Sequence, residues 1–202
     1  MIRDWSFRCW SAIYTHWASH NGATVALDEI ETLIARLLVP VPELAGAAEP
    51  LLARLRALAA DLPADAPVPT HGTFNPEQVL IDGERIGFID FDDFCMAAPA
   101  LDVGLFRAAI KDIGMNALES RDRAERQARL ELLDRIGETL LAEYERHAPI
   151  SRERVALWEA WSYFRNVLHV WVKVKPAEPD NAMMMLTHHI QMMGGRLHGA
   201  HP

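Results

Sequence analysis

Apolar residues recur at helical spacing along most of this chain. After Asp28, which can cap a helix, Leu and Ile recur every three or four positions as far as Pro40. A second amphipathic helix is predicted over residues 47–60, and the proline-rich stretch 61–69 ends it. Helices are again predicted over residues 100–114, 121–147, 151–174 and 180–197. Most of the molecule should therefore be helical.

One segment follows a different pattern, which indicates a β-hairpin. Val79, Leu80 and Ile81 precede Asp82-Gly83, and Ile86, Phe88 and Ile89 follow. Two short apolar runs around an Asp-Gly pair are typical of a tight hairpin. We find no other strand signal, so the predicted fold class is mainly α with a small β-hairpin.

Composition and charge exclude several classes of protein. The 202 residues are 50% hydrophobic with a net charge of −8, which predicts a folded globular chain without a nucleic-acid partner. The two cysteines, Cys9 and Cys95, lie far apart and form no metal-binding or disulfide pattern. The first thirty residues lack the apolar stretch of a signal peptide, and charged or polar residues interrupt the richest apolar segment, 155–174. We therefore expect a cytoplasmic protein with no membrane partner.

Three carboxylates gather at the end of the predicted hairpin. Asp90, Asp92 and Asp93 follow its second strand, and Gln78 precedes its first. Crowded carboxylates repel one another, and Mg²⁺ prefers carboxylate and amide oxygens, so a metal site is one interpretation. The other is that Asp92 and Asp93 are solvated loop residues and that Asp90 caps a turn.

Three motifs in and around the hairpin resemble one enzyme family. The sequence runs H-G-T-F-N-P-E-Q from His71, I-D-F-D-D from Ile89 and A-P-A-L-D from Ala98. This order resembles the catalytic segment of aminoglycoside phosphotransferases and the related choline kinase-like enzymes, which read H-G-D-x-x-x-x-N, a hairpin, I-D-[FW] and D-P-A-x-D. The resemblance implies a protein-kinase-like fold, ATP with Mg²⁺, and transfer of the γ-phosphoryl group to a small-molecule hydroxyl acceptor.

The resemblance assigns roles to individual residues. The position of the family's catalytic Asp holds Thr73, and that of its metal-binding Asn holds Gln78. Asp90 keeps the position of the second metal-binding Asp, His71 that of a residue that supports the loop, and Asp102 that of a residue that braces it. A threonine hydroxyl is not a base near neutral pH. We therefore expect Thr73 to be non-functional in catalysis, and weak Mg²⁺ or Mn²⁺ binding at Gln78 and Asp90, assisted by Asp92 or Asp93.

The residues before His71 differ from the N-terminal lobe that the resemblance implies. A kinase-like N-lobe supplies a phosphate-covering loop and a lysine for the nucleotide. The residues before His71 read as helices and contain no lysine. We therefore predict an N-terminal helical segment over 1–69 and a kinase-like C-lobe over 70–202, with the catalytic-loop hairpin at 71–93 and the N-lobe sheet missing.

Three functional hypotheses remain open at this stage. The chain is a truncated or divergent phosphotransferase, inactive alone, whose N-lobe comes from another chain. Alternatively it is a non-catalytic, pseudokinase-like module that binds a metal, a nucleotide or a protein, or a decayed product without a site function. The N-terminal residues Trp5, Trp10 and Trp17 further suggest a homodimer in which they cover an apolar face.

Overall fold

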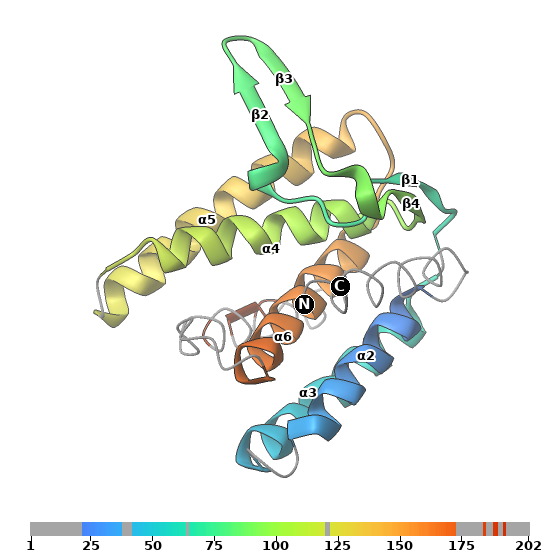
Figure 1. The fold of residues 1–202 in the computed structure, drawn as a ribbon, viewed down its shortest axis with the longest axis vertical. Coiled ribbons are helices and arrows are strands. Elements are labelled where there is room, and N and C mark those ends of the chain that lie inside the picture. Colours follow the sequence, from blue (N-terminus) through green and yellow to red (C-terminus); the bar gives the residue numbers. More distant parts are fainter. Residues whose placement is uncertain are drawn as a thin grey trace, which may run out of the picture.

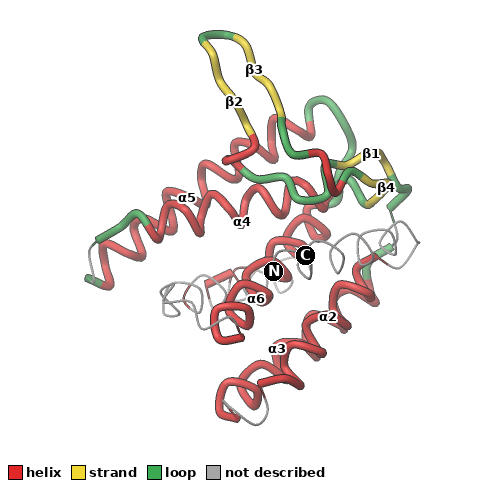
Figure 2. Tube along the Cα trace, in the orientation of Figure 1, coloured by secondary structure: helices red, strands yellow, loops and turns green. Residues whose placement is uncertain are grey.

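The structure is a computed structural model that describes residues 22–37, 42–63, 65–119 and 122–172, and the single residues 184, 188, 189 and 192 (Figure 1). The predicted helix over 180–197 and the three N-terminal tryptophans lie mostly or wholly outside these residues. Within the described part, long helices make up most of the chain and two short strand pairs lie at one end (Figure 2). The helices are α2 (Gly22–Leu37), α3 (Pro42–Asp61), α4 (Ala100–Asn116), α5 (Arg123–Glu145) and α6 (Arg152–Val172).

Helix α6 is the centre of the helical body. It packs against α4 on one side and against α2 and α3 on the other, and α5 lies beside α4. Trp158 and Trp161 are almost fully buried, and the Trp161 indole donates a hydrogen bond to the carbonyl of Ala26 (2.9 Å). Residues before position 69 therefore share a core with the C-terminal helices.

The helix boundaries differ from the predicted ones mainly at N-termini. Helix α2 begins at Gly22 rather than near Asp28, and α3 begins at Pro42 rather than near residue 47. Proline fits the first turn of a helix because its missing N–H has no intrahelical partner there. Pro42 therefore starts α3. Among the described residues, no helix is both long and apolar enough to cross a membrane.

A second strand pair, which the sequence did not predict, closes the base of the hairpin segment. Strands β1 (Val68–Thr70) and β4 (Cys95–Ala97) pair antiparallel, with Val68 opposite Ala97 and Thr70 opposite Cys95. The expectation of a single hairpin was therefore wrong. Each of these strands has only three residues, too few to show the alternating pattern of a strand, and their pairing joins residues that are distant in the sequence.

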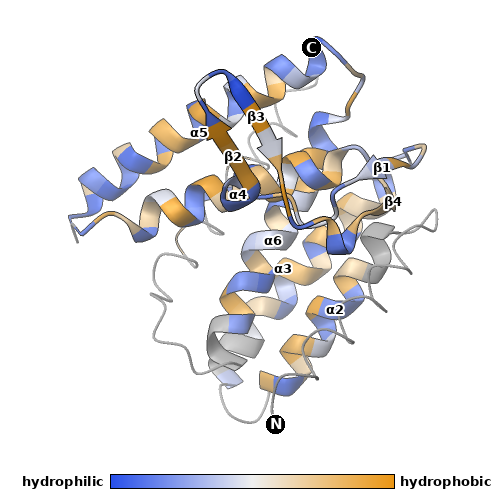
Figure 3. Ribbon diagram, turned by 45° about the horizontal axis from the view of Figure 1, so that its top comes forward, coloured by the Kyte–Doolittle hydropathy of each residue, from blue (hydrophilic) through white to orange (hydrophobic). Residues whose placement is uncertain are grey.

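The predicted hairpin is present as β2 (Val79–Asp82) and β3 (Arg85–Phe88), with Gly83 in the turn at a φ of 61°. Its register places Val79 opposite Phe88 and Ile81 opposite Ile86. Side chains that face each other across a strand pair lie on the same side of the sheet, so these four form one apolar face. The hairpin projects from the helical body, and Ile81 and Ile86 are 73% and 64% exposed (Figure 3).

Candidate functional site

Residues 71–78, called here the catalytic-loop segment, run from β1 to the start of the hairpin. Gly72 passes under Asp93 with a φ of 88°, and a Cβ atom at Gly72 would lie only 2.2 Å from the Asp93 carbonyl oxygen. Only glycine accepts both this conformation and this close approach. Gly72 thus brings the His71 loop and the Asp92-Asp93 turn against each other.

Asp102, in the first turn of α4, fixes the start of this segment. Its carboxylate accepts hydrogen bonds from the backbone N–H of His71 (2.6 Å) and of Gly72 (2.9 Å). Burial raises the pKa of Asp102, and these backbone hydrogen bonds oppose the rise because they favour the charged form. The contacts match the bracing position that the resemblance assigns to Asp102.

His71 connects the loop to the end of the hairpin. Its Nε2 lies 2.9 Å from the carbonyl oxygen of Ile89, so this nitrogen donates the hydrogen bond. The ring also contacts Phe74 and Phe91, at centroid distances of 5.6 and 4.7 Å. His71 is therefore held between the two sides of the candidate site, while its role as loop support stays a prediction.

Thr73 and Gln78 stand close together where the family pattern has a catalytic Asp and a metal-binding Asn. The half-buried Thr73 hydroxyl lies 3.4 Å from Gln78 Nε2, which donates to it. The carbonyl of Thr73 accepts a hydrogen bond from the Asn75 side chain (3.1 Å). No carboxylate therefore occupies the position at which the family places its proton acceptor.

The structure brings Gln78 to Asp90, but with the amide nitrogen facing the carboxylate. Gln78 Nε2 donates to Asp90 Oδ2 (3.1 Å), while Gln78 Oε1 accepts from the backbone N–H of Asn75 (3.0 Å). Among the described residues, Asp90 is the only non-glycine residue with a positive φ, at 68°. The left-handed conformation turns the chain from β3 into the short helix η2 (Phe91–Asp93).

Asp92 and Asp93 belong to this same turn. Partial burial and the neighbouring carboxylates of Asp90 and Asp92 raise the pKa of Asp93. In the part of the chain that the structure describes, no three His, Cys, Asp or Glu side chains come together in a way that could hold a metal ion. Of the three predicted metal ligands, Gln78 and Asp90 are in contact, and the Gln78 oxygen is directed elsewhere. As it stands, this set of donors does not fit Mg²⁺.

The sequence model of the phosphotransferase enzyme family matches residues 13–136, more than half of the chain. This chain belongs to that family. The match includes the catalytic-loop segment, the hairpin and Asp102, which carry the geometry described above. No curated protein sequence matches this family member.

Solved structures with the same fold include glucosamine kinases. Crystal form B of a glucosamine kinase has a TM-score of 0.66 and 19% identity, covering 90% of this chain and 47% of that protein. A glucosamine kinase in complex with glucosamine, ADP and inorganic phosphate has a TM-score of 0.63 and 18% identity, covering 94% of this chain and 49% of that protein. The family member described here thus spans about half the length of these kinases, and at this identity the likeness establishes the fold.

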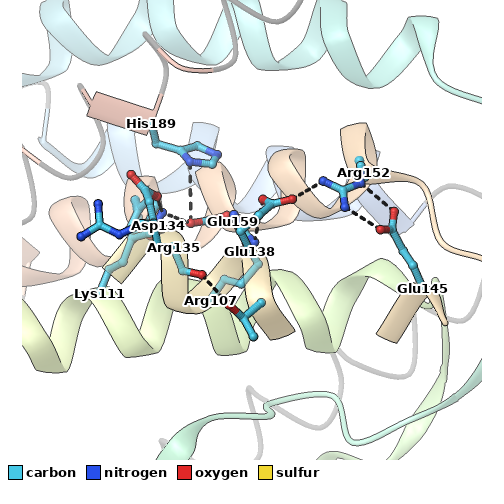
Figure 4. A network of polar contacts seen from close by, with 11 residues as sticks. Arg107, Lys111, Asp134, Arg135, Glu138, Glu145, Arg152, Glu159 and His189 are labelled. Atoms are coloured by element: carbon cyan, nitrogen blue, oxygen red, sulfur yellow. Dashed lines mark hydrogen bonds and ion pairs between the residues drawn. The ribbon is translucent and has the colours of Figure 1, made fainter. Parts of the chain in front are cut away.

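A second polar centre in this family member is buried between α4, α5 and α6 (Figure 4). Arg107 Nε donates to Glu159 Oε2 (2.9 Å), and the Lys111 ammonium and the Tyr163 hydroxyl donate to Glu159 Oε1. Lys111 also pairs with Asp134 of α5. Glu159 is fully buried, and burial raises its pKa, but the interactions with His189, Lys111 and Arg107 outweigh burial and hold the pKa of Glu159 far below its usual range. The cluster joins three helices through charge.

The sequence contained a signal for this centre that we did not use. Glu159 is a charged residue on a helix of largely apolar residues. A charge on an apolar face is buried with a partner, because an isolated buried carboxylate would lose its hydration without compensation. Beside the cluster lies a pocket of about 220 Å³, lined among others by Arg107, Glu138, Arg152 and His189.

One buried and two half-buried acids predict how stability depends on pH. Glu159, Asp134 and Glu29 have folded-state pKa values below their usual values of 4.5, 3.8 and 4.5. Their stabilising contribution is complete above those values and is lost as pH falls below them, because the unfolded chain then takes up protons that the folded chain does not. The raised pKa values of Asp93, Asp102 and Asp112 act in the opposite direction and offset part of this loss. We expect the free energy of unfolding, measured by urea denaturation, to fall between about pH 5 and pH 3. A flat profile over this range would contradict the expectation.

Proposed function

We propose that this chain carries the helical, catalytic-loop lobe of a kinase-like phosphotransferase, with residues 70–202 as that lobe, and that it transfers no phosphoryl group by itself. The ancestral reaction would use ATP and a small-molecule hydroxyl acceptor. The observation that carries the proposal is the position of Thr73, whose hydroxyl is hydrogen-bonded to Gln78 where the family has a carboxylate.

The chemistry of the reaction explains why this substitution matters. Phosphoryl transfer depends on a group that orients the attacking hydroxyl and accepts its proton, and on charge that stabilises the transferring group. A threonine hydroxyl can orient an acceptor through a hydrogen bond, but it cannot accept a proton near neutral pH. Asp102 and His71 preserve the shape of the loop, so the scaffold of the site is retained while its proton acceptor is absent.

The ligands to test first follow from the structural neighbours. One of the glucosamine kinases was solved with glucosamine, ADP and inorganic phosphate. A metal ion is not among the ligands proposed here, because the Gln78 amide N–H and not an oxygen faces Asp90. An amino sugar and an adenine nucleotide are therefore the proposed small-molecule partners.

A non-catalytic binding module is the second candidate function. It is favoured by the intact hydrogen bonds of Asp102 to His71 and Gly72, which keep the loop ordered although Thr73 removes the proton acceptor. Under this alternative the chain binds a nucleotide or a sugar without turnover. Calorimetric titration with ADP and with glucosamine distinguishes it, because heat of binding without product would favour the module.

The test of the proposed function is an ADP-release assay with ATP, MgCl₂ and glucosamine, an aminoglycoside or choline as acceptor. We expect no turnover above background from the natural chain or from Thr73→Asp. In Thr73→Asp the Gln78 oxygen would still face Asn75, so it would not be available to bind a metal ion. The matched control is Thr73→Asn, because asparagine has nearly the size of aspartate but carries no charge. Robust turnover by the natural chain would refute the proposal. Rescue by Thr73→Asp alone would show that the lost carboxylate is the only defect.

A further inference from the structure

Gln78 is buried in the candidate site, and both ends of its side-chain amide are hydrogen-bonded. It is 6% exposed, and its amide bonds to three partners: Asn75 N–H (3.0 Å), Asp90 Oδ2 (3.1 Å) and Thr73 Oγ1 (3.4 Å). Its backbone carbonyl accepts from the N–H of Ile89 (3.1 Å). These four contacts connect residues 73–78, before the hairpin, with residues 89 and 90, after it.

The orientation of the amide follows from its partners. Turning the amide over would place its NH₂ group against the N–H of Asn75 and its oxygen against the Asp90 carboxylate, so both hydrogen bonds would become repulsive contacts. Asn75 Oδ1 accepts a hydrogen bond from the Glu77 N–H (2.9 Å), and Asn75 and Gln78 form a capping box at η1 (Pro76–Gln78), which fixes the same geometry. The Gln78 oxygen is therefore committed to the backbone and not to a ligand.

Side-chain length explains how one amide reaches both partners. An asparagine at position 78 would be shorter by one methylene group and could not span from Asn75 N–H to Asp90. A Mg²⁺ ion would have to lie about 2.1 Å from a carboxylate oxygen of Asp90, with a second oxygen turned toward it. At Oδ2 that approach meets the hydrogens of Gln78 Nε2 instead. The amide N–H thus supplies the positive partial charge that a cation would otherwise provide.

We propose that the Gln78 amide takes the place of a divalent cation at Asp90, so that this loop assembles and stays folded without Mg²⁺. The inference concerns cation binding alone. It rests on the hydrogen bonds of Gln78 and holds whether or not the chain transfers phosphate, so activity is not its readout.

The test compares the natural chain with Gln78→Glu by thermal denaturation, in millimolar MgCl₂ and in NaCl of equal ionic strength. The natural chain should melt at the same temperature in both salts. Gln78→Glu places a second carboxylate against Asp90, so Mg²⁺ should raise its Tm on the order of 2–4 °C above the NaCl value, as expected for a ligand present at a few times its Kd. The matched control is Gln127→Glu, which places a carboxylate beside Glu131 on an exposed part of α5; in this solvated position Mg²⁺ should cause no such rise.

Two outcomes would overturn the inference. The first is a Mg²⁺-specific rise in Tm of the natural chain that Asp90→Asn abolishes, and the second is a Gln78→Glu protein that responds to Mg²⁺ no more than Gln127→Glu. Titration of the isotope-labelled natural chain with Mn²⁺ covers the case in which Gln78→Glu does not fold. We expect no selective broadening of the amide resonances of Ile89 and Asp90, and selective broadening there that Asp90→Asn removes would contradict the proposal.

Discussion

Glu159→Ala is expected to lower the free energy of unfolding by about 3–5 kcal/mol, because it leaves two buried cations without their shared partner. Arg107 and Lys111 are 5% and 2% exposed and both bond to the Glu159 carboxylate, so neither can recover its hydration. Urea denaturation followed by circular dichroism measures the change. Asp134 stays beside Lys111 and offsets part of the loss at that residue.

The matched control for Glu159 is Glu131→Ala on α5. Glu131 is exposed and accepts a hydrogen bond only at the surface, from Gln127 (3.2 Å), so its removal should change stability by less than about 1 kcal/mol. A second variant, Glu159→Gln, keeps the shape and removes the charge, and it should fall between the two. Equal stabilities for Glu159→Ala and Glu131→Ala would show that the buried cluster contributes nothing to folding.

Asp102→Ala is expected to destabilise the chain by roughly 2–4 kcal/mol, because the N–H groups of His71 and Gly72 would remain buried without an acceptor. Burying the Asp102 carboxylate is itself unfavourable, and the variant no longer has this cost. The loss of stability should therefore be smaller than the sum of two broken hydrogen bonds. Chemical denaturation measures the global effect. Limited proteolysis within residues 71–94 reports whether the loop opens first.

Asp112→Ala on the same helix is the control for this second prediction. Asp112 accepts a side-chain hydrogen bond from Asn116 (3.2 Å) near the helix surface, so its loss should cost less than that of Asp102. If the two variants are equally stable and equally resistant to protease in residues 71–94, Asp102 does not brace the loop.

The sequence predicted the helical body well because its signals are local. The spacing of apolar residues in α2, α4 and α6 repeats over several turns, so each helix could be recognised from its own residues. The hairpin was recognised for the same reason, through Asp82-Gly83 between two apolar runs. The β1–β4 pair was missed because its pairing depends on chain closure and not on a local pattern.

The details of the site could not be predicted because they depend on single contacts. A sequence shows that Gln78 replaces an asparagine, but not that its oxygen turns to Asn75 and its nitrogen to Asp90. The ion cluster required the packing of three helices before Arg107, Lys111 and Glu159 could be placed together. The N-terminal tryptophans lie outside the described residues, and the homodimer stays a prediction.

The pairing of β1 with β4 sets residues 71–94 apart from most of the helical core. Residues 71–94 begin and end at this strand pair, their first residues are held to Asp102 of α4, and the hairpin strands are exposed along nearly their whole length. A substitution at Thr73 changes few contacts with α5 or α6, so its cost to the folded state is small compared with that of a change at Glu159. Residues of this loop can therefore be exchanged with little effect on the stability of the helical core.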